Sequence, residues 1–184
     1  MLSDDQVIQS VLAGKVQNFE ILIDRYSSRI INFINRMITD YDEAENIGQD
    51  IFLKVYENLS KYKMEGNFKT FIFTIARNRT LNYIKRKKRV QFFSQMPENQ
   101  SVDSYFSYED HPADRIEKSE KDRALLDALS QIKENQRLAL ILKVYLEMSY
   151  KEIRDITGWS IPKIETLISR AKGSLKKKLQ EMRG

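Results

Sequence analysis

The sequence predicts an all-α protein of two small helical domains joined by a flexible acidic linker. Of its 184 residues 31% are charged, with 6 glycines and 3 prolines, a composition that favours helices over sheets. Apolar residues recur at steps of three and four along most of the chain, whereas no stretch alternates long enough to predict a strand. We expect domains at residues 1–92 and 121–184, with residues 93–120 as the linker.

The composition also excludes several classes of protein. The chain has no cysteine, which removes disulfides, thiolate metal sites and cysteine nucleophiles. Its longest uncharged stretch, residues 6–14, is far shorter than the ~18 residues of a membrane-spanning helix. The first residues lack the basic start and apolar core of a signal peptide. We therefore expect a cytoplasmic protein with no direct membrane insertion.

Four helices are expected in the first domain. A short one over 4–13 is closed by Gly14, and a longer one follows over 19–37. Asp42 is expected to cap the third helix, because carboxylates accept hydrogen bonds from the free N–H groups of a first turn. The fourth helix is expected from residue 68 to about residue 89.

The second domain carries the sharpest local signal. Helices are expected over 121–132 and 135–146, and Ser149 with Glu152 forms a capping box that opens another. A turn containing Gly158 leads to a final helix, which gives the layout of a helix-turn-helix. A generic helical hairpin is the alternative. The candidate duplex-binding residues on and before the final helix are Ser160, Lys163, Thr166, Leu167, Arg170 and Lys172.

The charges are segregated along the chain. Residues 40–60 are acidic, residues 61–89 are strongly basic, the linker is acidic and the C-terminal tail is basic again. Two basic blocks separated by an acidic link suggest two domains that touch one polyanion. The alternative is a set of solvated helix faces.

Aromatic rings are interleaved with cations in the first basic block. Cations follow phosphates, rings stack on unpaired bases, and amides one helical turn apart can read base edges. For each ring, a place in the core is the alternative. The candidate residues for single-stranded nucleic acid are Tyr62, Lys63, Phe68, Phe71, Arg77, Asn78, Asn82, Lys85, Arg86 and Arg89.

The two halves resemble, in order, the bacterial RNA polymerase sigma factors of the extracytoplasmic-function group. Residues 42–56 resemble the helix with which this family binds core polymerase. Residues 68–84 resemble its segment that melts the promoter and reads the −10 element. Residues 127–179 are similar to region 4, which reads the −35 element.

This resemblance implies a transcription initiation factor, not an enzyme, with no cofactor or metal. The implied partners are promoter DNA, the β′ clamp helices and β flap of core polymerase, and an anti-sigma factor of a kind often tethered to the membrane. The first basic block would melt and capture the −10 element, and the helix-turn-helix would hold the −35 duplex. The residues implied to bind core polymerase are Asn46, Gln49, Asp50, Leu53 and Lys54.

Three positions depart from the family pattern. Phe71 stands where the family usually has Trp, and Glu165 and Leu167 replace residues that are usually basic. We expect a weaker phosphate grip and an altered −35 preference, with Leu167 against a thymine methyl group.

Two rival functions remain open from the sequence. A stand-alone regulator would bind duplex DNA without polymerase, although it would not need the aromatic and basic segment. An adaptor would use its basic faces to bind acidic proteins. An enzyme finds no support, because His111 is the single histidine and lies in the acidic link without a nucleophile or metal-ligand arrangement nearby.

Overall fold

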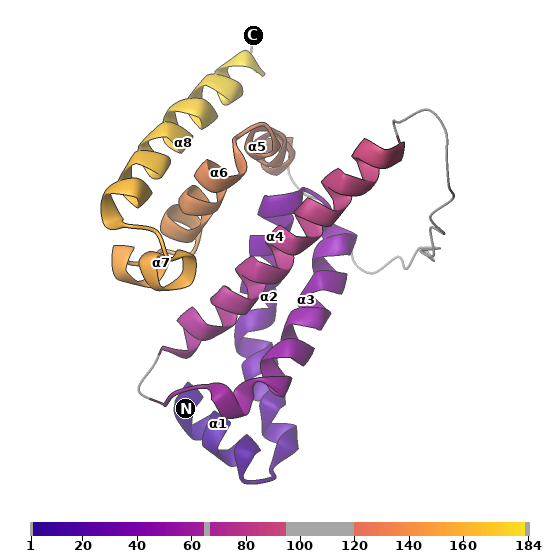
Figure 1. The fold of residues 1–184 in the computed structure, drawn as a ribbon, viewed down its shortest axis with the longest axis vertical. Helices are drawn as coiled ribbons and strands as arrows, with labels where there is room; N and C mark the ends of the chain where they lie inside the picture. Colours follow the sequence, from indigo (N-terminus) through magenta and orange to yellow (C-terminus); the bar gives the residue numbers. More distant parts are fainter. Residues whose placement is uncertain (1, 65–66, 95–119, 183–184) are drawn as a thin grey trace.

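The computed structural model describes residues 2–64, 67–94 and 120–182, and within these ranges it contains helices and no strand (Figure 1). The all-α prediction is confirmed. Short helical turns lie at Val16–Asn18 (η1), Leu59–Lys61 (η2) and Ile141–Tyr145 (η3). The α-helices are α1 (Asp4–Leu12), α2 (Phe19–Ile38), α3 (Tyr41–Glu57), α4 (Phe68–Ser94), α5 (Glu120–Ser130), α6 (Glu134–Leu140), α7 (Tyr150–Thr157) and α8 (Ile161–Glu181).

Helices α2, α3 and α4 form the bundle of the N-terminal half. Phe33 of α2 and Phe73 of α4 are both fully buried, and their rings meet edge to face with centroids 5.7 Å apart. Helices α2 and α3 approach each other closely at Gly48, where an added Cβ would lie 3.2 Å from Cγ1 of Ile31. The contact of α2 with α4 therefore depends on two large rings, whereas the contact of α2 with α3 depends on the absence of a side chain at Gly48.

The caps explain where the N-terminal helices begin and end. Ser3 and Gln6 form a capping box at the start of α1, and Gly14 beyond its end adopts a φ of +98°. The prediction that Asp42 caps α3 is wrong. Asp40 is the N-cap and accepts a hydrogen bond from the Glu43 N–H, because the helix already starts at residue 41.

The C-terminal half contains the predicted capping box and turn. The Ser149 hydroxyl accepts from the Glu152 N–H, and Gly158 closes α7 with a φ of +71°. Ser160 occupies the N-cap of α8 but makes no hydrogen bond there with its side chain. The three- and four-residue spacing of apolar residues in this helix predicts that Ile161 faces inward, but it is 38% exposed. The helix predicted over 135–146 changes at residue 141 into the wider π-helical turn η3.

Most of the predicted linker falls on residues 95–119, which lie outside the described residues, as does His111. Across the described ranges, no helix is long and apolar enough to cross a membrane. The same ranges hold no group of three or more acidic, histidine or cysteine side chains that could bind a metal.

The two halves pack against each other. Helix α7 contacts α4, and helices α5 and α6 contact α2 (Figure 1). One apolar cluster runs through both halves, from Phe33 and Phe73 to Leu142, Met148 and Ile153. The described structure is therefore a closed arrangement of the two halves.

Replacing Phe73 by alanine tests the centre of the N-terminal bundle. Because the ring is fully buried, Phe73→Ala is expected to lower the free energy of unfolding by about 3–5 kcal/mol. Urea denaturation followed by circular dichroism measures it. Val90→Ala, at a 60% exposed position of the same helix, should change little. Equal losses in the two variants would contradict the assigned core.

Candidate nucleic-acid interface

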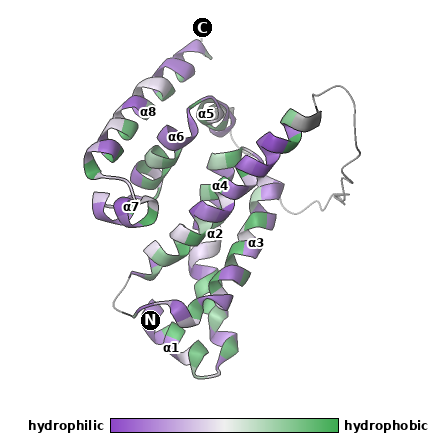
Figure 2. Ribbon diagram, in the orientation of Figure 1, coloured by the Kyte–Doolittle hydropathy of each residue, from purple (hydrophilic) through white to green (hydrophobic). Residues whose placement is uncertain are grey.

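The exposed side of α4 carries a run of cations. Lys85, Arg86 and Arg89 are exposed, and Lys87 lies 5.7 Å from the centroid of the Tyr83 ring. Figure 2 shows this C-terminal half of α4 as largely hydrophilic, in purple. Within this run, Lys88 forms an ion pair with Glu134 of α6, and its Nζ lies 2.9 Å from Oε2 of the glutamate. The run therefore offers adjacent cations to a phosphate backbone.

A hollow of about 350 Å³ lies between α3 and α4. This volume is within the range of small-molecule pockets. The predicted residues Phe71, Asn78 and Asn82 line it together, and Arg77 donates a 3.1 Å hydrogen bond to Oδ1 of Asn78. The remaining lining residues are Lys54, Asn58, Lys61, Ile75 and Arg79. The hollow thus combines amides and cations with one aromatic ring.

Two of the predicted base-stacking rings lie in the core. Tyr62 is 8% and Phe68 2% exposed, and their rings meet edge to face with centroids 5.6 Å apart. Tyr62 also lies 5.4 Å from Phe71, the half-buried ring at the hollow. In this conformation Tyr62 and Phe68 pack against the Phe71 ring. Neither of them exposes a ring face on which a base could stack. Lys63 is exposed at the surface beside them.

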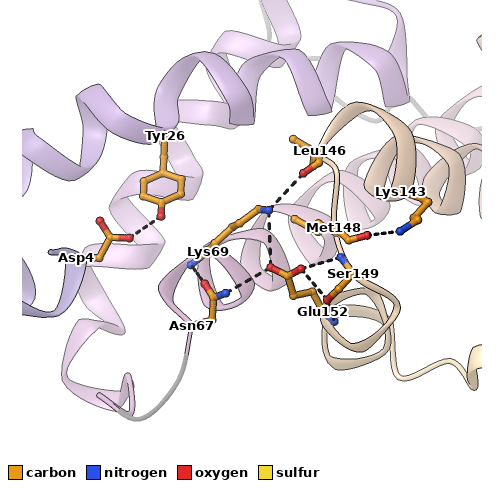
Figure 3. A network of polar contacts seen from close by, with 9 residues as sticks. All are labelled: Asp4, Tyr26, Asn67, Lys69, Lys143, Leu146, Met148, Ser149 and Glu152. Atoms are coloured by element: carbon orange, nitrogen blue, oxygen red, sulfur yellow. Dashed lines mark hydrogen bonds and ion pairs between the residues drawn. The ribbon is translucent and has the colours of Figure 1, made fainter.

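Hydrogen bonds to aspartates of α1 hold Tyr62 and a further ring, Tyr26 (Figure 3 shows the latter). The Tyr62 hydroxyl donates to Oδ1 of Asp5 at 2.8 Å, and the Tyr26 hydroxyl donates to Oδ2 of Asp4 at 2.6 Å. Burial, followed by the hydrogen bond and charge of the aspartate, raises the pKa of Tyr62 and that of Tyr26. Asp4 also pairs with Arg25. This role of α1 is not predictable from the sequence, because nothing in the local pattern links Asp5 to a residue in another element.

The outer face of α3 presents the residues predicted to bind polymerase. Asn46, Gln49, Asp50 and Leu53 are exposed, and Leu53 is 65% exposed although it is apolar. Lys54 is half-buried and pairs with Glu57 at 2.7 Å. Tyr56, which was not among the predicted residues, is 42% exposed and packs edge to face on Phe19. Such a face, apolar in its middle and polar around it, is typical of a protein-binding surface.

The predicted duplex-binding residues of α8 lie on a polar face that is largely exposed to solvent. Ser160, Lys163, Thr166, Arg170 and Lys172 are exposed. Lys163 lies 5.2 Å from the centroid of the Trp159 ring, and the Thr166 hydroxyl donates to the Pro162 carbonyl at 2.9 Å. Leu167 is half-buried against the core, so only part of its side chain is available to a ligand.

The hydroxyl of Tyr62 provides a test of how the hollow is held. Tyr62→Phe removes the bond to Asp5 and is expected to lower the free energy of unfolding by about 1–3 kcal/mol, since the acceptor is charged. Thermal or urea unfolding checks this. Tyr56→Phe, at an exposed ring, is the matched control. If both changes had the same effect, the Asp5 contact would not stabilise the fold.

Comparison with family models gives two matches. The model described as "Sigma-70 region 2" matches residues 22–90. The model described as "Sigma-70, region 4" matches residues 122–175. The first match includes most of α4 and the hollow, and the second includes α7 and the exposed face of α8.

Full-length relatives agree with these matches. The RNA polymerase sigma factor YlaC of Bacillus subtilis is 29% identical over 90% of this chain and 94% of its own length. The ECF RNA polymerase sigma-E factor of Haemophilus influenzae is 24% identical over 98% of this chain and 97% of its own. Among solved structures, the sigma factor RpoE in complex with the anti-sigma factor NepR from Bartonella quintana has a TM-score of 0.69 at 26% identity. That match covers 89% of this chain and 98% of the relative.

Proposed function

This chain belongs to the sigma-70 family, as an extracytoplasmic-function sigma factor of promoter-specific transcription initiation, and we propose that three of its surfaces divide that work. The observation that carries the proposal is the presence, on one chain, of a basic helix beside an amide-lined hollow and of an open helix-turn-helix face. The domains proposed for these roles are residues 1–92 and 121–184, joined by residues 93–120.

The hollow between α3 and α4 would bind a base of the −10 element that has left the duplex. Asn78 and Asn82 can donate and accept hydrogen bonds at a base edge, and Phe71 offers the ring at the wall. Arg77 orients the Asn78 amide through its hydrogen bond. The cations Lys85, Arg86 and Arg89 would hold the phosphates on either side. Tyr62 and Phe68 would support this wall without touching DNA.

The outer face of α3 would bind the β′ clamp helices of core polymerase. Leu53 and Tyr56 supply apolar area at its centre, and Gln49 and Asp50 supply hydrogen-bonding groups at its edge. The side chains of Asn46 and Lys54 would complete the contact. The chain would therefore act through the active site of the polymerase, not through one of its own.

The face of α8 would enter the major groove at the −35 element while the same domain meets the β flap. Lys163, Thr166, Arg170 and Lys172 are placed for bases and phosphates, with Ser160 at the helix start. Glu165 is also exposed there and repels phosphate, which supports an unusual −35 preference.

One further partner and a location follow from the family. The solved relative is bound to the anti-sigma factor NepR, and this supports an anti-sigma factor as a partner of this chain. Membrane tethering of that partner would be a property of the partner alone. Since polymerase and promoter lie in the bacterial cytoplasm, the proposed function places this protein there.

Removing three cations from α4 tests the −10 surface. Lys85→Ala, Arg86→Ala and Arg89→Ala together are expected to weaken open-complex formation more than core binding. For single-stranded DNA, the slope of log affinity against log salt should fall by about 2. Titration with forked −10 DNA and with core polymerase measures both, and Lys15→Ala with Arg29→Ala, which removes exposed cations outside α4, is the control. Equal loss of both activities would count against the division.

Substitutions on α3 should weaken polymerase binding and leave DNA binding unchanged. Gln49→Ala with Asp50→Ala is expected to lower affinity for core polymerase about tenfold, because both side chains lie on the proposed contact face. Binding of the full chain to −35 duplex should not change. Glu20→Ala removes an exposed acid from α2 and serves as the control. A loss of duplex binding, or none of polymerase binding, would place the polymerase contact elsewhere.

A further inference from the structure

A second hollow, of about 550 Å³, lies in the C-terminal half, between the C-terminal part of α8 and the start of α6 with the turn before it. We call it the C-terminal hollow. Figure 1 shows α5 and α6 beside α8, and both helices contact it. Four cations, two amides, a hydroxyl, a glycine and one apolar side chain line the hollow, and no acid is among these described residues. They are Gln131, Ile132, Lys133, Gln136, Arg170, Gly173, Ser174, Lys177 and Lys178.

An apolar cluster holds the floor of the C-terminal hollow in place. Ile132 is 4% exposed and packs with Leu129, Leu140 and Ala171, which fixes the turn against α8. The buried Arg137 guanidinium donates to the Leu129 carbonyl at 3.4 Å and so ties α6 to the end of α5. The fold therefore builds the hollow, and the cations at its rim are not needed to hold it open.

The cations of the hollow are largely uncompensated. Within the described residues Lys133 and Arg170 form no ion pair, and Lys133 makes no side-chain cap hydrogen bond at α6. Lys177 and Lys178 share a single carboxylate, that of Glu181, with their Nζ atoms 3.9 and 3.0 Å from it. Pairs as exposed as these contribute little. An excess of positive charge is thus available to an anion.

Gly173 leaves room in the C-terminal hollow. Apart from proline, glycine is the residue least favourable to a helix, and Gly173 lies in the middle of α8. A Cβ at this position would meet nothing within 4 Å, whereas one at Gly48 would press on Ile31. Packing therefore explains Gly48 but not Gly173. A ligand that comes close to the backbone of α8 does explain it.

The C-terminal hollow continues the face of α8 proposed for the −35 element. Lys163, Thr166, Arg170, Ser174 and Lys177 follow one another at steps of three and four residues, so they lie along one side of the helix. At about 1.5 Å per residue, Lys177 lies about 21 Å beyond Lys163, although the major groove is only about 12 Å wide. In a helix-turn-helix, the N-terminal residues of the second helix contact the base edges. The hollow therefore lies where α8 leaves the groove and crosses the phosphates.

The chemistry of the lining favours phosphates over a protein partner. Lysine, arginine, glutamine and serine side chains are typical donors to phosphate oxygens in DNA complexes. A protein partner would need apolar area at the centre of the contact, but the apolar side chain of the lining, Ile132, is buried. The exposed Glu165 of α8 repels phosphate. Cations beyond the groove supply the attraction that this part of the helix lacks.

We propose that the C-terminal hollow binds the phosphate backbone of the duplex that flanks the −35 element. Lys133 and Lys177 hold the phosphates from the two rims, and Gln131, Gln136 and Ser174 donate hydrogen bonds to their oxygens. The contact reads no base, so it adds affinity without sequence preference and extends the bound duplex beyond the −35 element. The proposal rests on the proposed function above, which places the face of α8 in the groove.

Removing one cation from each rim tests the site. Lys133→Gln with Lys177→Gln is expected to lower the slope of log affinity against log salt by about 2, because each lysine neutralises one phosphate. Fluorescence anisotropy of the full chain measures it, and two duplexes of unrelated sequence should give the same fall. Arg123→Gln with Lys176→Gln removes two exposed cations of α5 and α8 that do not line the hollow. This control has the same net charge and should keep the original slope.

A reporter beside the hollow identifies the occupant. Because the chain has no cysteine, Ser130→Cys places a single fluorophore on the exposed last residue of α5. We expect duplex DNA to change its fluorescence at a lower concentration of negative charge than tripolyphosphate or polyglutamate does. Gly173→Glu puts a carboxylate into the hollow and should abolish the change, whereas Gly173→Gln, of the same size, should retain it. Both variants should fold, because a Cβ at this position meets no neighbour.

Two results would overturn the proposal. One is a salt slope of the Lys133→Gln, Lys177→Gln variant that equals the slope of the control. The other is a reporter that responds to tripolyphosphate or polyglutamate more readily than to duplex DNA. If either occurred while polymerase-dependent transcription was intact, the phosphate site would fail and the proposed function would stand. If the slope fell as expected but the chain directed no transcription by core polymerase, the phosphate site would stand and the proposed function would fail.

Discussion

The packing of α4 against α2 and α3 is the constraint on which the other features depend. One side of α4 is committed to the core through Phe68, Ile72 and Phe73, and the buried hydroxyl of Thr80 is satisfied by the Ala76 carbonyl at 2.8 Å. That commitment fixes the rotation of the helix about its axis. Asn78 and Asn82 must then face the hollow, and Lys69 must face the C-terminal half. A single helix thus supports the core, the proposed −10 surface and the contact between the halves.

The distribution of charge follows from the same geometry. Acidic residues open α3, where the positive end of the helix dipole favours them, and they leave that face unattractive to DNA. The cations gather on α4, across the hollow, and the C-terminal half offers Glu134 and Glu152 to the cations that it covers. The proposed surfaces for protein and for nucleic acid are therefore neighbouring faces of one small bundle, with Lys54 at the border between them.

The sequence predicted the helices and the helix-turn-helix because their signals are local. The capping box of Ser149 and Glu152 spans only four residues, and Gly158 is the residue type that a left-handed turn favours. Local signals were insufficient at positions whose role depends on tertiary contacts. Asp40 and Asp42 are equally good caps by type, and Tyr62 and Phe68 look like stacking rings until α1 and α2 enclose them. The capping box alone accounts for a glutamate at position 152, so nothing in the sequence pattern indicated its second contact, with Lys69 of the other half (Figure 3).

The most direct test of the account is transcription from fragmented host DNA by core polymerase, with and without this protein, with the RNA 5′ ends mapped. The account predicts new start sites that share −35 and −10 elements and that are lost when the cations of α4 are removed. A polymerase that is active with another sigma factor, yet makes no new starts with this chain, would contradict it. The chain would then be better explained as a regulator that binds duplex DNA alone, and it should fail to bind isolated β′ clamp helices.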